Sequence, residues 1–292
     1  MKRRTLVSAA VGAGLLGGCT LSADHDHNGA DAPRAMPLAR PVRTAWVFSS
    51  GGPRGFVHVG VIKALSEMGL APDLLVGASI GAAVAVMVAC GKPVLDIEQF
   101  ALELKPLSLG RVALGGGARL SGAAISDMVR SEVSGLLLER MRTPVVCVAA
   151  RMSDGLLTGF NAGDAGLAVQ ASCAIEGQFT PVRIRGEQYV DADLYQPLPV
   201  RLARQLGATR ILAVDASAHE GRAPAGTERY RAGDLRKRAL TEPDVRAADV
   251  TLHPEFGYYV NLSREFRETA ISAGYRATIA ASRQLAALHA GA

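Results

Sequence analysis

The feature that most constrains this chain is an alternation of short apolar segments with helical segments, separated by glycine and proline. Thr44 to Ser49 is a short apolar run that ends in a cluster of glycines, and Phe56 to Met68 then carries apolar residues at helical spacing. Leu74 to Val76 indicates a second strand, and Ile80 to Cys90 indicates a second helix. This order favours parallel strands joined by right-handed crossovers, so the sequence predicts an α/β fold.

Later segments continue the alternation. Further strands are predicted at Pro144 to Ala150, Ile211 to Asp215 and Val250 to His253. Further helices are predicted at Ser121 to Val133, Ala165 to Ser172, Val200 to Leu206 and Leu262 to Leu288. The 292 residues are 49% hydrophobic, which is enough for the core of one domain of about 250 residues. The polar and charged segment Glu220 to Arg238 predicts a mobile surface loop.

The amino-terminal segment is typical of an export signal. Lys2, Arg3 and Arg4 precede an apolar run from Leu6 to Leu16, which is shorter than the roughly 20 residues that cross a bilayer. The run ends in Leu16-Gly17-Gly18-Cys19, which resembles the lipobox of bacterial lipoproteins, where the cysteine is lipidated and becomes the first residue. We therefore expect a signal peptide at residues 1–18, lipidation of Cys19 with a flexible tether over residues 19–41, and the folded domain at residues 42–292.

These expectations also concern location and partners. Acyl chains contribute about 0.8 kcal/mol per buried CH₂, so a lipidated Cys19 would anchor the protein to a membrane surface. Thr20 rather than an aspartate after the cysteine favours, by the same resemblance, the outer membrane of a bacterial cell envelope, on the side that faces the periplasm. Removal of the three signal-peptide cations would lower the net charge from +5 to +2. The remaining cations are mixed with acids, so the sequence does not favour a nucleic-acid partner.

A candidate nucleophile lies between the second predicted strand and the helix that follows it. Gly77-Ala78-Ser79-Ile80-Gly81 has the G-x-S-x-G pattern of a nucleophile elbow, in which a sharp turn exposes the serine hydroxyl. Small residues on both sides allow the close backbone approach that such a turn needs. The pattern and its position make Ser79 the candidate nucleophile.

A glycine-rich turn follows the first predicted strand. Ser50-Gly51-Gly52-Pro53-Arg54-Gly55 would expose backbone N–H groups that suit either a phosphate or the oxyanion of acyl transfer. It departs from a dinucleotide fingerprint, because Ser50 replaces the first glycine and no acid follows the second strand at the expected distance. The oxyanion role fits better beside a serine elbow. Pro53 has no N–H, so the amides of Gly51, Gly52 and Arg54 are the candidate donors.

A third motif, Asp191-Ala192-Asp193, follows the strand-like Glu187 to Val190. With it, the order of motifs resembles the patatin-like phospholipase family: a glycine-rich S-S-G-G-P-R-G-F-V-H-V-G-V, a G-A-S-I-G elbow about 25 residues later, and a D-x-x-L-x-x-P-L-P-V block. The stretches Ala171 to Ile175 and Phe179 to Val182 also resemble that family. The resemblance covers nearly the whole chain after the signal and tether segments.

The resemblance implies a three-layer α/β fold with a mostly parallel central sheet. It also implies a serine acyl hydrolase that cleaves fatty-acyl esters of phospholipids or lysophospholipids with a Ser-Asp dyad and without a metal or an organic cofactor. Ser79 matches the nucleophile, Asp191 matches the base, and the Gly51-Gly52 turn matches the oxyanion loop. Two motifs depart from the family pattern: Ser50 replaces the first glycine of the glycine-rich motif, and Asp191-Ala192-Asp193 replaces D-G-G or D-G-A. The second departure puts a side chain at Ala192 and a second carboxylate, Asp193, beside Asp191.

Two alternatives remain open at the level of sequence. The altered Asp191-Ala192-Asp193 motif is compatible with a non-catalytic lipoprotein that keeps the fold to bind lipid or a partner. A Ser-His-Asp triad would need a histidine after Ser79, and of the three available we single out His219 for testing. The apolar segment Leu104 to Leu114 is a further candidate, as a lid or a lining for an acyl chain.

Overall fold

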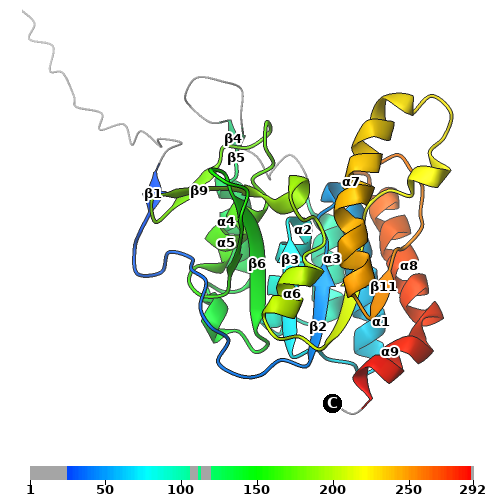
Figure 1. The fold of residues 1–292 in the computed structure, drawn as a ribbon, viewed down its shortest axis with the longest axis horizontal. Coiled ribbons are helices and arrows are strands. Elements are labelled where there is room, and N and C mark those ends of the chain that lie inside the picture. The colour runs from blue at the N-terminus through cyan, green and yellow to red at the C-terminus, as the bar shows by residue number, and fades with distance from the viewer. Residues whose placement is uncertain (1–24, 106–110, 113–119, 291–292) are drawn as a thin grey trace, which may run out of the picture.

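The apolar segments of the sequence form the centre of a large sheet. The computed structural model describes residues 25–105, 111–112 and 120–290 (Figure 1). In these residues a nine-stranded sheet has the order β1-β8-β9-β6-β3-β2-β10-β11, with β7 also paired to β6. Its strands are β1 (Asp26–His27), β2 (Thr44–Phe48), β3 (Leu74–Ala78), β6 (Val145–Arg151), β7 (Leu157–Phe160), β8 (Val182–Ile184), β9 (Glu187–Asp191), β10 (Arg210–Val214) and β11 (Val250–Leu252). A separate pair joins β4 (Arg111–Val112) to β5 (Leu120–Ser121).

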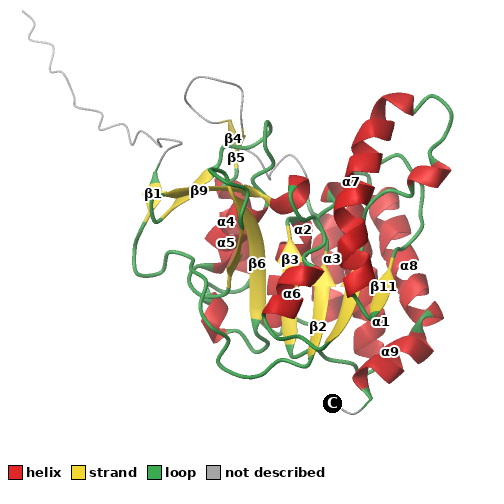
Figure 2. Ribbon diagram, in the orientation of Figure 1, coloured by secondary structure: helices red, strands yellow, loops and turns green. Residues whose placement is uncertain are grey.

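Five neighbouring strands, β6, β3, β2, β10 and β11, run parallel, which confirms the predicted mostly parallel sheet. Helices cover both faces (Figure 2). They are α1 (Val57–Glu67), α2 (Ile80–Ala89), α3 (Val94–Glu103), α4 (Ala123–Glu132), α5 (Ala165–Ser172), α6 (Val200–Gln205), α7 (Glu228–Ala247), α8 (Arg264–Ala280) and α9 (Ser282–His289). No helix of the described ranges combines the length and the apolar character needed to cross a bilayer.

The two faces of the sheet have separate cores because successive side chains of a strand point to opposite faces. In β2, Trp46 and Phe48 pack with α1, α2 and α8, whereas Ala45 and Val47 pack with α6 and the partly buried apolar residues of α7. The larger core therefore lies on the face of α1 to α5, α8 and α9, and a smaller one lies under α6 and α7. This arrangement is the expected three-layer fold.

The structure corrects three expectations. Glu220 to Arg238 is not a loop: a short 3-10 turn (Glu220–Arg222) is followed by α7, a helix of 20 residues. Only Thr241 and Asp244 of α7 are buried, so the helix has almost none of the apolar periodicity that marked the others. The segment Leu262 to Leu288 forms two helices, α8 and α9, instead of one. The sequence patterns also did not predict α3, β7 or β8.

The third correction concerns the tether. Residues 25–41 do not extend freely from the domain, because β1 pairs in parallel with β8, which would otherwise be the edge strand of the sheet. Arg34 N donates to Ala162 O at 2.9 Å, and Ala32 is buried. Covering a free edge strand satisfies backbone groups that would otherwise be exposed. The predicted tether is thus wrong over these residues; residues 19–24, and with them Cys19, lie outside the described ranges.

The helices α1 and α8 cross at two glycines. A Cβ atom on Gly60 would lie 1.8 Å from Ile271 O, and a Cβ atom on Gly274 would lie 2.1 Å from Val57 O. Both distances are far below van der Waals contact, so each glycine is required for the backbones to approach. Since α1 follows directly from the glycine-rich turn after β2, this crossing helps to fix the position of that turn.

We expect Gly274→Ala to destabilise the protein by about 1–3 kcal/mol, because the new methyl group must push α8 away from α1. The matched control is Gly233→Ala in α7, where a Cβ atom meets nothing within 4 Å. That change should be neutral or stabilising by about 0.5–1 kcal/mol, through the higher helix propensity of alanine. Urea unfolding of the two variants measures the difference, and equal stabilities would contradict the role of the crossing.

Candidate active site

Ser79 lies in a strained turn between β3 and α2. Its backbone has φ 54° and ψ −126°, a conformation that non-glycine residues seldom adopt. Glycines make the turn possible: a Cβ atom on Gly77 would lie 2.3 Å from Gly81 O, and one on Gly81 would lie 2.5 Å from Phe48 O. Strain of this kind persists only where the surrounding structure enforces it, and it is concentrated at functional sites. The turn thus has the backbone of a nucleophile elbow.

Ser172, at the end of α5, holds the turn in place. Ser79 N donates to Ser172 Oγ at 2.8 Å, and Ser172 Oγ donates to Val148 O at 2.6 Å. The first amide of the turn is therefore tied to the sheet through a buried hydroxyl. Sequence reasoning noted this segment only for its family resemblance and did not identify the contact.

Strand register brings Asp191 to Ser79. Over residues 147–150, β7 occupies one edge of β6, so β3 and β9 must share the other edge. Ala78, the last residue of β3, is opposite Val148, and Asp191, the last residue of β9, is opposite the next residue, Ala149. Ser79 follows Ala78 directly. Two residues that are distant in sequence thus meet where the ends of two strands adjoin.

Asp191 is a buried residue, 3% exposed. Its Oδ1 accepts a hydrogen bond from Asp193 N at 2.9 Å, whereas Oδ2 is buried without a hydrogen-bond partner of standard geometry in the described structure. Burial and the neighbouring Asp193 charge raise the pKa of Asp191 to about 7, while the nearby Ser79 hydroxyl acts in the opposite direction. One carboxylate oxygen is therefore available as a proton acceptor beside Ser79, with a pKa near neutrality.

The glycine-rich turn approaches Ser79 from the end of β2. Gly52, with φ 51°, lines the same cavity as Ser79. The amides of Gly51 and Gly52 have no hydrogen-bond acceptor among the described residues. The Arg54 amide, by contrast, donates to Gly51 O at 3.1 Å within the turn. This corrects the expected set of oxyanion donors, because the intrachain bond occupies the Arg54 amide and leaves those of Gly51 and Gly52.

The Arg54 side chain is held by contacts within the domain. Its Nε donates to Ala216 O at 3.0 Å and its Nη1 to Gly257 O at 3.1 Å, and the guanidinium stacks 4.3 Å from the centre of the Phe256 ring. The side chain is buried. Arg54 therefore ties the turn to the loops that follow β10 and β11.

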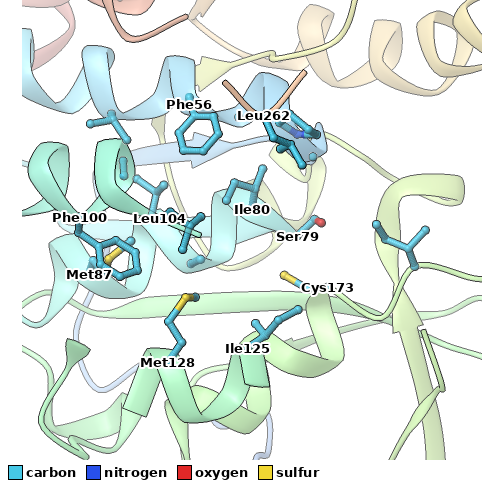
Figure 3. A pocket seen from close by; sticks show the side chains of 18 of the residues that line it. Phe56, Ser79, Ile80, Met87, Phe100, Leu104, Ile125, Met128, Cys173 and Leu262 are labelled. Carbon is cyan, nitrogen blue, oxygen red and sulfur yellow. The ribbon is translucent and has the colours of Figure 1, made fainter. Parts of the chain in front are cut away.

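Ser79 opens onto an apolar cavity of about 200 Å³. Figure 3 shows Ser79 and Cys173 at one end of this cavity and Phe100 and Met87 at the other, with Met128 below and Phe56 above. Leu104 also lines it, which agrees with the expected apolar lining by the segment that begins there; residues 106–110 and 113–119 lie outside the described ranges. The Ser79 hydroxyl is thus the polar group at the end of a hydrophobic cavity.

The histidines take part in other contacts. His219 and His253 stack with their ring centres 3.7 Å apart, and His289 accepts a hydrogen bond from the Trp46 ring N–H at 3.1 Å. His58 is fully buried against Ser49 O, and burial lowers its pKa to about 4. In the described part of the chain, no histidine is hydrogen-bonded to Ser79 or lines its cavity. The same residues contain no cluster of three histidine, cysteine or acidic side chains that could hold a metal ion.

Sequence reasoning missed Lys237. This residue lies on α7, the helix that the sequence did not predict, and its Nζ is 2.5 Å from Asp193 Oδ1. Asp193 Oδ1 also accepts a hydrogen bond from Ser50 Oγ. The structure thus places the Asp193 carboxylate in a polar network beside Asp191.

Comparison with known proteins agrees with this geometry. The sequence profile of the patatin-like phospholipases matches residues 46–204, which include the glycine-rich turn, the elbow and Asp191. The chain belongs to the patatin-like phospholipase family. The crystal structure of VipD from Legionella pneumophila superimposes with a TM-score of 0.57 at 14% identity, covering 91% of this chain and 71% of VipD, which shows the shared fold.

The regions that match this chain make up only part of each sequence relative. An uncharacterized NTE family protein of Mycobacterium tuberculosis is 30% identical over 197 residues, which are 65% of this chain and 54% of the relative. The lysophospholipase NTE1 of Coccidioides immitis is 28% identical over 62% of this chain and 12% of its own length. The human patatin-like phospholipase domain-containing protein 6 is 26% identical over 60% and 13%. The chain thus matches about half of the mycobacterial relative and a small part of the other two.

The raised pKa of Asp191 predicts a pH-dependent cost in stability. A carboxyl group with a pKa near 4 in the unfolded chain and about 7 in the folded protein binds more protons when folded, so stability is lost as pH rises from about 4 to about 7. Asp191→Asn removes this cost. Above pH 7 we expect the variant to be more stable than the wild type by about 2–4 kcal/mol, and by much less near pH 4. Urea unfolding at several pH values tests this, and a pH-independent difference would contradict it.

Proposed function

We propose that the protein is a serine acyl hydrolase that cleaves fatty-acyl esters of phospholipids or lysophospholipids. The observation that carries the proposal is the position of Ser79, between a buried carboxylate and an apolar cavity. Family membership and the similarity to the lysophospholipase NTE1 of Coccidioides immitis support lipid hydrolysis as the general chemistry. Of the residues predicted for the site, Ser79, Asp191, Gly51 and Gly52 carry the proposed reaction.

In this proposal the cavity binds the acyl chain and places the ester carbonyl at its Ser79 end. Because the lining is apolar, transfer of the chain from water is favourable by about 0.8 kcal/mol per buried CH₂. The polar head group then lies outside the cavity. Positioning the carbonyl beside the hydroxyl makes the attack effectively unimolecular.

Asp191 acts as the general base. Its free Oδ2 accepts the proton of Ser79 as the serine oxygen attacks the carbonyl carbon. The Gly51 and Gly52 amides stabilise the negative charge of the tetrahedral intermediate, and the positive end of α2 contributes from behind Ser79. The same proton is then passed to the departing alkoxide, leaving acyl-Ser79. A water molecule then attacks acyl-Ser79 and gives a proton to Asp191, which returns it to the Ser79 oxygen as the fatty acid is released.

Ser79→Ala and Asp191→Asn should each lower kcat/KM for a short-chain ester by about 10³-fold or more, because nucleophile and base act as a unit. The matched control is Ser134→Ala, the same substitution at another serine with positive φ (53°), in a turn away from the cavity. Its turnover should equal that of the wild type. Purified protein with a chromogenic ester provides the measurement, and thermal unfolding checks that each variant is folded.

His219→Ala separates the dyad from a triad and should retain full activity. In the pH profile of this variant, kcat/KM should still fall on the acid side near pH 7, where protonation of Asp191 removes the base. This acid limb should be the same as that of the wild type. Loss of activity in a folded His219→Ala protein would contradict the dyad. Absence of turnover in the wild type itself would favour the alternative, a non-catalytic lipid- or partner-binding protein on this fold.

We also propose that the protein is a lipoprotein of a bacterial cell envelope, anchored through Cys19 to the outer membrane on its periplasmic side. The support is the lipobox-like Leu16-Gly17-Gly18-Cys19 directly after an apolar run. Cys19→Ser should abolish incorporation of radioactive palmitate in a bacterial host, whereas Cys90→Ser, at a half-buried residue of the domain, should leave labelling unchanged. Labelling that persists in Cys19→Ser would refute the anchor.

A further inference from the structure

Three side chains from distant parts of the sequence form a polar network beside the proposed active site. Lys237 Nζ, from α7, is 2.5 Å from Asp193 Oδ1 and 3.2 Å from Ser50 Oγ. Ser50 Oγ donates to the same Asp193 oxygen. Ser50 and Asp193 are two of the three positions, with Ala192, at which the sequence departs from the pattern it resembles, and they contact each other. These two polar side chains therefore form one structural feature, completed by a lysine.

Each end of this network adjoins a proposed reacting group. Ser50 precedes the Gly51-Gly52 turn, and Asp193 follows Asp191 by two residues. Asp193 N donates to Asp191 Oδ1 at 2.9 Å, so the backbone of Asp193 orients the base directly. The network thus connects the turn that carries the oxyanion donors to the loop that carries the base.

The helix that carries Lys237 is itself firmly held. Asp244, a buried residue of α7, accepts from Gln196 Nε2 at 2.7 Å and from Arg201 N at 2.8 Å. The Arg201 guanidinium adds two bonds to its second oxygen, at 3.2 and 3.1 Å. Gln196 and Arg201 lie in the segment that follows Asp193. Because α7 is anchored to that segment, Lys237 is positioned by the fold.

Charge near the base depends on this lysine. The charged groups that act on Asp191 are Asp193, which raises its pKa, and Lys237, which lowers it; the Ser79 hydroxyl and the neutral Cys173 thiol also lie near it. Burial raises the pKa of Asp193 and Lys237 lowers it, with a net shift below its usual value, so Asp193 stays ionised. Without the ammonium group, an uncompensated carboxylate would lie next to Asp191.

We propose that Lys237 is a positioning residue of the active site, which through Asp193 and Ser50 holds the glycine turn against the base loop and compensates the second carboxylate. An ordinary surface ion pair contributes little. This pair differs because both side chains are mostly buried, at 21% and 32% exposure, and share a third partner. The role in catalysis rests on the proposed function, but the electrostatic effect on Asp191 does not require turnover.

The test compares Lys237→Met with Arg236→Met, which removes an exposed cation from the adjacent position of the same helix. The titration of Asp191 is followed by carbon NMR of protein labelled at the aspartate carboxyl carbons, with the signal assigned by its loss in Asp191→Asn. Lys237→Met should raise the pKa of Asp191 by about 0.5–1 unit, and Arg236→Met should leave it in place. An unchanged value in Lys237→Met, or an equal shift in both variants, overturns the proposal.

Two further variants test the direction in which each charge shifts the pKa of Asp191. Lys237→Arg restores the cation and should return the titration of Asp191 to within about 0.3 unit of the wild type. Asp193→Asn removes the carboxylate and should lower the pKa of Asp191. A rise in Asp193→Asn, or failure of Lys237→Arg to rescue, contradicts the network. This readout needs no substrate. If Lys237→Met does not fold, Lys237→Gln serves as the second charge-removing variant.

The kinetic measurement separates this inference from the proposed function. If esters are hydrolysed, the acid limb of kcat/KM should move up in Lys237→Met together with the NMR titration, giving a three- to tenfold loss of rate below the limb. A uniform loss at all pH values with an unmoved limb would show a merely structural role and overturn the electrostatic part. If the wild type hydrolyses no ester while the NMR shift occurs, the proposed function fails and the network stands.

Discussion

The structure depends on one edge of β6. That strand pairs with β7 on one side, and on the other side it pairs first with β3 and then, beyond the end of β3, with β9. Hydrogen-bond register along this edge therefore decides which residues meet at the junction. A shift of one residue would turn the side chains of β9 to the opposite face and separate Asp191 from Ser79. The geometry of the site is a consequence of sheet pairing more than of any side-chain contact.

The site combines features that each cost stability. Ser79 occupies an unfavourable backbone conformation, and Asp191 is a buried acid whose ionisation is opposed by burial and by Asp193. The surrounding structure enforces both: the Ser172 hydroxyl holds the elbow, and the close crossing of α1 and α8 supports the glycine turn. A base with a pKa near neutrality is suited to proton transfer, so the energetic cost and the proposed function have the same origin.

Much of the candidate site was accessible from sequence because it is local. The elbow around Ser79 needs glycine on both sides for reasons of backbone contact, and those glycines form a readable motif. Asp191 and the Gly51-Gly52 turn were predicted as site residues from the order of motifs that resembles the family. The Arg54 amide was assigned wrongly, because which amides remain free depends on the bond that Arg54 makes to Gly51 within the turn. Lys237 could not be found, because it lies on α7, a helix with little apolar periodicity.

The sequence by itself determined the α/β alternation, the central parallel strands and the identity of the elbow, since periodicity and glycine placement act over a few neighbouring residues. Only the tertiary structure decided that β9 continues the edge of β3, that residues 25–41 lie against the domain and that Ser50, Asp193 and Lys237 share one network. These outcomes arise from pairing between segments that are distant in sequence, or from a helix held by the buried carboxylate of Asp244. Such interactions leave no periodic signal in the chain, because their partners are brought together only by folding.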